Sequence, residues 1–414
     1  MPQRIEVRLA WRNVWRNWRR TALTVAATVF AVFLVEMSVA MSAGTHSKMI
    51  EDGVKMASGH LTLAGRGYLE QRTLEQFVPA SAELERLLDR TEAIIGWAAR
   101  VSSFALLSFG DRSNGVAVLG VDPARESSVS SLPTRVSSGR FLSSDGRREI
   151  VLGAALARDL AAEVGDELLL YGIAYSLETA YELFRVVGIL RIPSPDLERA
   201  LALISLRDAQ EFFVYGDRVS EIAILARDAE AGLALRDPLE AALVALGTEG
   251  LELYGWAELM PELEQFVLLD RGGMYLQLII LVVVVGFGIL NTILMSVLER
   301  TRELGVMRAL GLSSGAVSRI VYLESMAVSA VGLVIGLALA APCALYFEQN
   351  PIPLRGEFEA MTELLGMEPL IVFDFAPAQV GYVSLMVAIV ALLAAAYPAF
   401  KAGRLRPVDA LRSL

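Results

Sequence analysis

The sequence contains very little cysteine, histidine and lysine. Among its 414 residues there is one cysteine, Cys343, and there are two histidines, His46 and His60. One cysteine cannot form a disulfide within the chain, and a zinc site made from cysteine and histidine side chains is not expected. The net charge is −10 and no block of basic residues occurs, so the composition argues against a nucleic-acid-binding protein.

Lysine occurs at three positions, 48, 55 and 401, and the residues before them are Ser47, Val54 and Phe400. The phosphate-binding loop of an ATPase has the form Gly-x-x-x-x-Gly-Lys-Ser/Thr, in which a glycine precedes the lysine. The chain therefore cannot carry this loop. Nor does any pattern around His46 or His60 favour a Ser/His/Asp nucleophilic site. We expect a non-catalytic chain with no cofactor and no metal site of its own.

Long apolar stretches, in contrast, are abundant. Hydrophobic residues make up 54% of the chain and the mean hydropathy is +0.49, which is high for a soluble protein. A helix needs about 20 apolar residues to cross a bilayer. Four stretches are long enough: residues 21–43, 274–298, 322–346 and 378–399. The predicted fold class is an α-helical membrane protein with four transmembrane helices and a large α+β extracytoplasmic domain between the first two.

The short loops carry charge of opposite sign on the two sides of the membrane. Residues 1–20 hold six arginines against one acidic residue, and arginine is also frequent in 299–321 and in the tail 400–414. The loop 347–377 holds six acidic residues and one arginine. The positive-inside rule therefore predicts that both termini and 299–321 are cytoplasmic and that 44–270 and 347–377 lie outside. Trp11, Trp15 and Trp18 recur at helical spacing, which predicts an amphipathic helix over 1–20 at the cytoplasmic interface.

The segment 44–270 has no spanning stretch and alternates between two kinds of pattern. Strands are predicted at 60–64, 101–109, 116–121, 149–152, 168–171, 184–190, 200–205 and 221–225, and helices at 81–90, 154–162, 206–213 and 229–246. This order predicts an α+β domain of one or two lobes. Its 21 basic and 35 acidic side chains give −14, which we interpret as a solvated surface in preference to a docking face for a basic partner.

The cytoplasmic loop begins with ERTRELGVMRALGLSSG at residues 299–315. Leu304, Met307 and Leu310 recur every three residues, which predicts a short amphipathic helix with these side chains on one face. Gly311 can end that helix in a left-handed conformation, and Ser313 or Ser314 can cap the helix that follows. A short helix between two spanning helices favours contact with a soluble partner; a helix lying on the lipid surface is the alternative.

This loop is one of several segments that point to the same family. The others are AWRNVWRNWRRT (10–21), the tail YPAFKAGRLRPVDALR (397–412), and EIVLGAALARDL (149–160) with FRVVGIL (184–190). Together they resemble the FtsX/MacB-type (type VII) ABC transporter permeases. These motifs touch every topological segment, and the similarity is patchy between 64 and 148. The resemblance implies a subunit of the bacterial inner membrane. It also implies two permeases, the same chain twice or a sister chain, and two separate ATPase subunits that bind ATP and Mg.

In that family, closure of the ATPases moves the permease and does work on a cargo outside the membrane, which is called mechanotransmission. The residues that the resemblance assigns to ATPase coupling are Glu299, Arg302, Glu303, Leu304, Val306, Met307, Arg308, Leu310 and Gly311. MASGHLTL at 56–63 looks like the lipoprotein-releasing LolC/LolE permeases, so we expect lipoprotein release, with a periplasmic carrier or adaptor as a further partner. MacB-like export of peptides, drugs or other amphiphiles, and FtsX-like activation of a cell-wall hydrolase, are the alternatives.

Several residues inside the predicted spans are candidates for function. Glu36 is an acidic residue within the first span, where it either has a function or reaches the outer face. If the family resemblance holds, a lipid-bearing cargo would enter between spans one and two, lined by Phe30, Leu34, Tyr275 and Ile279. Gly332 and Gly336 form a small-residue stripe that packs either within one subunit or between paired permeases.

Overall fold

The computed structural model describes residues 18–56, 58–71, 74–192, 194–248, 250–359 and 369–404. They form two compact units. The first unit, called the membrane unit here, comprises Met1–His46, Leu268–Pro353 and Leu370–Leu414. The second, called the periplasmic unit here, comprises Ser47–Val267 with Leu354–Pro369. The amphipathic helix predicted around Trp11 and Trp15 lies outside the described residues, as does the tail from 405 onward.

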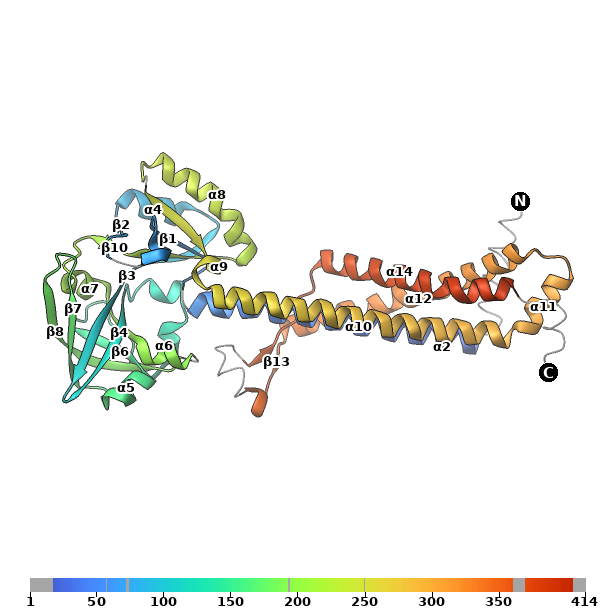
Figure 1. The fold of residues 1–414 in the computed structure, drawn as a ribbon, viewed down its shortest axis with the longest axis horizontal. Coiled ribbons are helices and arrows are strands. Elements are labelled where there is room, and N and C mark those ends of the chain that lie inside the picture. Colours follow the sequence, from blue (N-terminus) through green and yellow to red (C-terminus); the bar gives the residue numbers. More distant parts are fainter. Residues whose placement is uncertain are drawn as a thin grey trace. The chain divides into compact units, whose positions relative to one another are not determined.

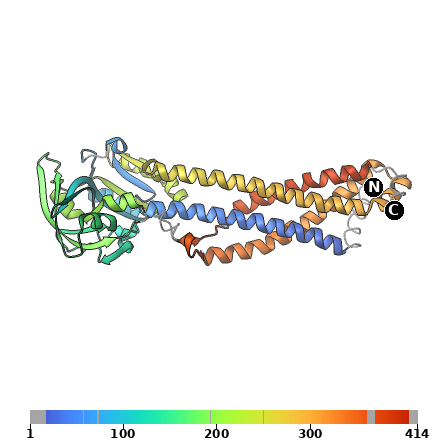
Figure 2. The ribbon, with the colours of Figure 1, turned by 60° about the horizontal axis from the view of Figure 1, so that its bottom comes forward.

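Four long apolar helices form the membrane unit, and all four are long and apolar enough to cross a bilayer. They are longer than the predicted spans because each helix continues past its apolar stretch. Figure 2 shows them side by side. This unit contains α11 (Thr301–Ala309), α12 (Ser314–Gln349), α14 (Pro377–Gly403) and the greater part of α2 (Trp18–Met56) and α10 (Pro261–Glu299). A hairpin of β13 (Ile352–Pro353) and β14 (Leu370–Ile371) lies between α12 and α14.

Small residues set how closely α12 approaches α2. A Cβ atom added to Gly332 would lie 2.6 Å from the Cβ of Thr28, and one added to Gly336 would lie 2.7 Å from the Cβ of Val32. Both distances are far inside van der Waals contact, so only glycine fits at these two positions. Of the two packings that the sequence left open, the small-residue stripe therefore adopts the one within a single subunit.

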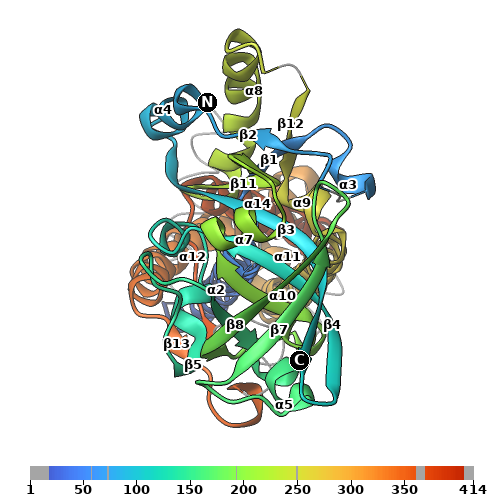
Figure 3. The same cartoon turned by 90° about the vertical axis from the view of Figure 1, so that its left-hand side faces the viewer.

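The periplasmic unit contains a ten-stranded sheet, which Figure 3 shows from one end. Its strands are β1 (Leu61–Gly65), β3 (Ile94–Phe109), β4 (Arg112–Val121), β5 (Val136–Gly139), β6 (Glu149–Gly153), β7 (Glu167–Ile173), β8 (Thr179–Leu190), β9 (Leu201–Ser205), β11 (Glu221–Ala226) and β12 (Leu251–Gly255). A second, two-stranded sheet pairs β2 (Val78–Pro79) with β10 (Arg218–Val219). The helices of this unit are α3 (Tyr68–Gln71), α4 (Ala82–Arg90), α5 (Ala154–Leu160), α6 (Pro195–Ala200), α7 (Leu206–Phe212), α8 (Ala229–Ala245) and α9 (Trp256–Leu259). Figure 3 labels α3, and Figure 1 labels the others.

The main sheet closes on itself over part of its width. Strand β3 pairs with both β4 and β7, and the pairings continue from β4 through β9, β6 and β8 back to β7. The interior of this ring is filled by apolar side chains, among them Leu107, Val118 and Phe184. Because β3 is 16 residues long, its first half also pairs with β11 outside the ring.

A second core lies where β11, β1 and β12 continue the sheet. There α4 and α8 pack onto the strands through Leu84, Leu88 and Leu239, around the buried Trp97. The two predicted lobes are therefore two cores that share one sheet, and the strand common to both is β3.

Every strand and helix predicted in 44–270 corresponds to an element of the structure. The elements that were not predicted are β2, β5, β10, β12, α3, α6 and α9, and β3 and β8 are longer than predicted. β3 extends into 94–100, which pairs with β11 far later in the chain, and β8 extends into 179–183, which pairs with the preceding strand β7.

Candidate functional site at the turn between α10 and α12

The helix α11 forms from local signals on both sides. Arg300 lies at its start with φ −100° and ψ 15°, so the backbone leaves helical geometry between α10 and α11. Gly311 has φ +98°, a left-handed conformation that favours glycine. The Ser313 side chain then accepts a hydrogen bond from the Ala316 N–H at 3.3 Å and caps α12. The predicted stop at Gly311 and cap at Ser313 are confirmed.

The inner face of α11 packs against its own bundle. Leu304 is 3% exposed and packs with Val297, Val317 and Val321 and with Ala399 and Ala402, while Met307 lies partly buried beside them. Leu310, by contrast, is 79% exposed. The prediction that Leu304, Met307 and Leu310 share one face was wrong, because α11 ends at Ala309 and the backbone turns at Leu310 before the face can continue.

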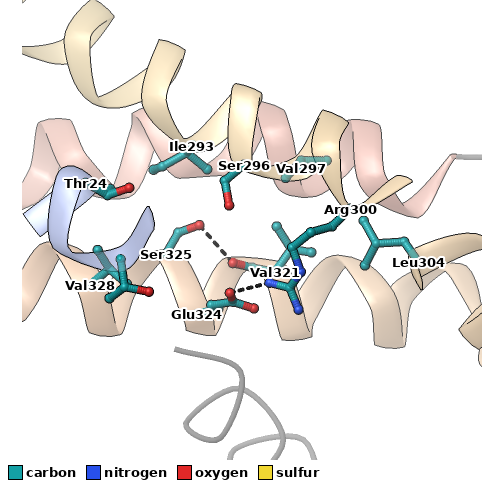
Figure 4. A pocket seen from close by; sticks show the side chains of 11 residues that line it. Thr24, Ile293, Ser296, Val297, Arg300, Leu304, Val321, Glu324, Ser325 and Val328 are labelled. Carbon is teal, nitrogen blue, oxygen red and sulfur yellow. Dashed lines mark hydrogen bonds and ion pairs between the residues drawn. The ribbon is translucent and has the colours of Figure 1, made fainter. Parts of the chain in front are cut away.

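A small polar cavity of about 40 Å³ lies beside α11 in the bundle (Figure 4). An ion pair lies on its wall: Arg300 Nη1 is 2.5 Å from Glu324 Oε1 of α12. Arg300 Nε also donates to Glu303 Oε2 at 3.2 Å. The residues that line the cavity are Thr21, Thr24, Ile293, Ser296, Val297, Arg300, Leu304, Val321, Glu324, Ser325 and Val328.

Neither Arg300 nor Glu324 was singled out as a site residue from the sequence. The available signal was an arginine two residues after the end of one apolar run and a glutamate two residues inside the next. Because charged residues in such places are costly unless paired, the two could have been matched as partners.

The other end of α11 is joined to α14. Arg308 Nη1 donates to the Gly403 carbonyl oxygen at 2.5 Å, and the Ser314 hydroxyl donates to the same oxygen. Since this carbonyl is among the last of α14, the two donors satisfy an acceptor that the helix itself leaves open. Arg308 thus holds α11 in place through its guanidinium.

The remaining predicted coupling residues lie on the outer surface of α11 and its flanks. The exposed ones are Glu299, Arg302, Glu303, Val306, Leu310 and Gly311. This surface combines charges of both signs with two exposed aliphatic side chains. The structure therefore divides the predicted set into inward residues (Leu304, Met307, Arg308) and outward ones.

The residues predicted to contact a lipid-bearing cargo fall into two groups. Phe30 and Leu34 on α2, and Tyr275 and Ile279 on α10, are exposed on the membrane unit. Glu36 points inward instead: it is 3% exposed and accepts a hydrogen bond from the Ser384 hydroxyl of α14 at 3.4 Å. Glu36 is therefore apart from the four apolar residues.

Within the described residues, no group of three or more His, Cys, Asp or Glu side chains is placed to hold a metal ion.

Two family models match the chain. The MacB-like periplasmic core domain matches residues 21–242, and the FtsX-like permease C-terminal domain matches residues 275–407. The first range contains most of α2 and the periplasmic unit as far as α8, and the second contains most of α10 with α11, α12 and α14.

Relatives with known names resemble most of the chain. The lipoprotein-releasing system transmembrane protein LolE of Haemophilus influenzae is 27% identical, over 80% of this chain and 80% of its own length. LolC of Neisseria meningitidis is 24% identical over 80% of each chain. The macrolide export ATP-binding/permease protein MacB of Bdellovibrio bacteriovorus is 26% identical over 71% of this chain and 43% of its own.

Among solved structures, the periplasmic region of MacB from Actinobacillus actinomycetemcomitans matches 51% of this chain and 94% of its own, with 16% identity and a TM-score of 0.37. The match of the family model to more than half of the chain decides the assignment. The chain belongs to the family of bacterial inner-membrane ABC transporter permeases that carry a MacB-like periplasmic core domain and an FtsX-like permease C-terminal domain.

Proposed function

We propose that the chain is the permease subunit that passes ATP-driven movement of a separate ATPase to its periplasmic unit, in order to release lipoproteins from the inner membrane. The observation that carries the mechanical part is the two-sided construction of α11. Its inner side is anchored in the bundle through Leu304, Arg300 and Arg308, and its outer side is exposed through Val306 and Leu310. A helix built in this way can be pushed from outside and transmit the displacement to the helices beneath it.

The orientation follows from the place of α11 in the chain. The periplasmic core domain is inserted between α2 and α10, and α11 follows the other end of α10. If α10 spans the membrane, α11 lies in the cytoplasm, where an ATPase would be. The arginine-rich segments of the sequence support the same orientation, with both termini cytoplasmic.

In this function the ATPase would bind ATP and Mg, and the permease would supply the contact surface. Two permeases would pair, each contacting one ATPase subunit. The lipoprotein cargo is supported by the names of the relatives LolE and LolC, which match along 80% of this chain. Export of an amphiphile is the second candidate, and the observation that favours it is the match to MacB of Bdellovibrio bacteriovorus.

The experiment targets the outer side of α11. Val306→Asp with Leu310→Asp should reduce co-purification of the ATPase with the tagged chain at least about tenfold, equivalent to about 1.4 kcal/mol, because both side chains are exposed and only a partner would bury them. Ala309→Ser, an exposed position on the same helix, is the matched control and should leave co-purification unchanged. Substitution of Met307 or Arg308 would be a poorer test, since both hold α11 against the bundle.

Mass spectrometry of the same purification from native membranes distinguishes the cargo. An ATPase together with a triacylated lipoprotein supports lipoprotein release. An ATPase together with a periplasmic adaptor or an outer-membrane channel supports export. Absence of any ATPase would contradict both.

A further inference from the structure

The ion pair between Arg300 and Glu324 joins two elements that are 24 residues apart in the chain. Arg300 lies at the break between α10 and α11, and Glu324 lies on α12. The two side chains are 10% and 17% exposed. Figure 4 shows the guanidinium turned toward α12. Charges so far removed from water remain ionised at low cost only when they are paired, so this contact is strongly constrained in geometry.

Arg300 uses two edges of its guanidinium at once. Nη1 contacts Glu324 on α12, and Nε contacts Glu303 in the first turn of α11. A planar guanidinium holds two carboxylates in a fixed relation, which a flexible lysine ammonium does not. Arg300 is also joined to the first turn of α11 through the backbone, since the Leu304 N–H donates to the Arg300 carbonyl oxygen at 3.0 Å. Its contact with Glu324 therefore fixes that turn to α12.

The apolar contacts point the same way. Leu304 of α11 lies in one apolar cluster with Val317 and Val321 of α12, and Val297 of α10 and Ala399 and Ala402 of α14 belong to the same cluster. The backbone leaves helical geometry at Arg300, between α10 and α11. The cluster therefore adds apolar contact between α11 and α12 to the direct charged contact of Arg300 with Glu324.

We propose that Arg300 and Glu324 are a positioning pair that makes α11 and α12 move as one body, so that displacement of α11 is passed to α12 and not absorbed at the turn. From α12 the displacement reaches α2 through the close contacts at Gly332 and Gly336. The source of the displacement rests on the proposed function; the rigid connection itself does not.

The test measures the distance between α11 and α12 directly. In a full-length chain with Cys343→Ala, nitroxide labels are placed at Ala309→Cys on α11 and Val334→Cys on α12, both exposed. Double electron–electron resonance is recorded in lipid nanodiscs without nucleotide or ATPase. We expect a narrow distance distribution in this chain and a distribution at least twice as wide after Glu324→Gln, which removes the charge with little change in shape.

Two further variants separate pairing from a general effect on folding. The exchanged pair Arg300→Glu with Glu324→Arg should restore the narrow distribution, because the attraction is re-formed with reversed sign. Glu303→Gln, which removes the more exposed partner of Arg300 (47% exposed), should leave it narrow. A Glu324→Gln distribution as narrow as that of the parent chain would overturn the proposal, and so would an exchanged pair as wide as Glu324→Gln.

These measurements are independent of the co-purification experiment. Loss of the proposed function would appear as a parent chain that binds no ATPase, whatever the label distances show. Failure of the positioning pair would appear as unchanged label distances in a chain that still binds its ATPase.

Discussion

The two units bury their side chains in different ways. In the periplasmic unit, hydrogen-bonded strands surround large side chains such as Phe184 and Tyr215, which are almost completely buried. In the membrane unit the close contacts are made by small residues such as Gly332 and Gly336, while large apolar side chains such as Phe287 point outward. The hydrophobic effect in water drives the packing of the periplasmic unit. In lipid this driving force between helices is absent, and close van der Waals packing of the helices takes its place.

Each unit nevertheless contains a buried arginine–glutamate pair. Arg100 and Glu126 in the periplasmic unit are 1% and 0% exposed, with Nη2 2.6 Å from Oε1. Arg300 and Glu324 in the membrane unit retain 10% and 17% exposure beside a cavity. The comparison indicates that the first pair is sealed inside a core, and that the second lies where helices meet, beside a small cavity.

The largest effect should come from breaking the sealed pair. Burial by itself lowers the pKa of Arg100, but the carboxylates of Glu126 and Glu221 outweigh it and raise that pKa above its ordinary value. Arg100→Ala leaves the Glu126 charge buried without compensation, so we expect the periplasmic unit to lose about 3–5 kcal/mol of unfolding free energy. Chemical denaturation of the full-length chain, followed by tryptophan fluorescence, measures this.

The matched control replaces both partners of that pair. Arg100→Met with Glu126→Leu removes the charges together and should cost clearly less than Arg100→Ala. An equal loss in the double variant would mean that packing at this position, not the uncompensated charge, dominates.

A smaller effect is expected at the helix contact in the membrane unit. Gly336→Leu forces α12 away from Val32 of α2 and should destabilise the bundle by about 1–3 kcal/mol. Gly288→Leu on α10 is the control, because a Cβ there meets nothing within 4 Å. The measurement is the temperature at which half of the purified chain leaves the monodisperse peak in mild detergent. If Gly288→Leu lowered this temperature as much, the close contact would not be the cause.

The smallest effect is a dependence on pH in the periplasmic unit. His60 is 3% exposed and its Nδ1 accepts the Ala226 N–H at 3.2 Å. Burial lowers the pKa of His60 below 6.5, against the opposing charges of Asp228 and Glu51 and together with the effect of Lys55. Below pH 6.5 the unfolded chain therefore binds a proton at His60 that the folded chain does not bind until a lower pH. Above pH 6.5 neutral His60 makes its full contribution to the free energy of unfolding. That contribution is lost, by at most about 1.4 kcal/mol per pH unit, as the pH falls from 6.5 to the lower pKa that His60 has in the folded chain.

His60→Gln tests this assignment, since the amide oxygen can accept from Ala226 but does not titrate in this range. We expect the variant to lose part of the slope of stability against pH between 6.5 and 5. The same slope in both chains would assign the pH dependence to other groups.

Much of the local structure was readable from the sequence. Runs of about 20 apolar residues define the spanning helices, and short apolar runs mark strands such as β7 and β9. Gly311 and Ser313 mark the end of α11 and the start of α12, because a left-handed turn and a side-chain cap depend on the identity of one residue and its nearest neighbours.

The tertiary structure decided what these elements contact. The closure of β3, β4, β9, β6, β8 and β7 into a ring, the partners of Gly332 and Gly336, and the pairing of Arg300 with Glu324 join residues separated by long stretches of chain. Leu304 and Leu310 are the same residue type at helical spacing, yet Leu304 is buried and Leu310 is exposed. Hydrophobic periodicity reports the conformation of a few successive residues, whereas burial and charge pairing depend on which distant surface the chain brings against them.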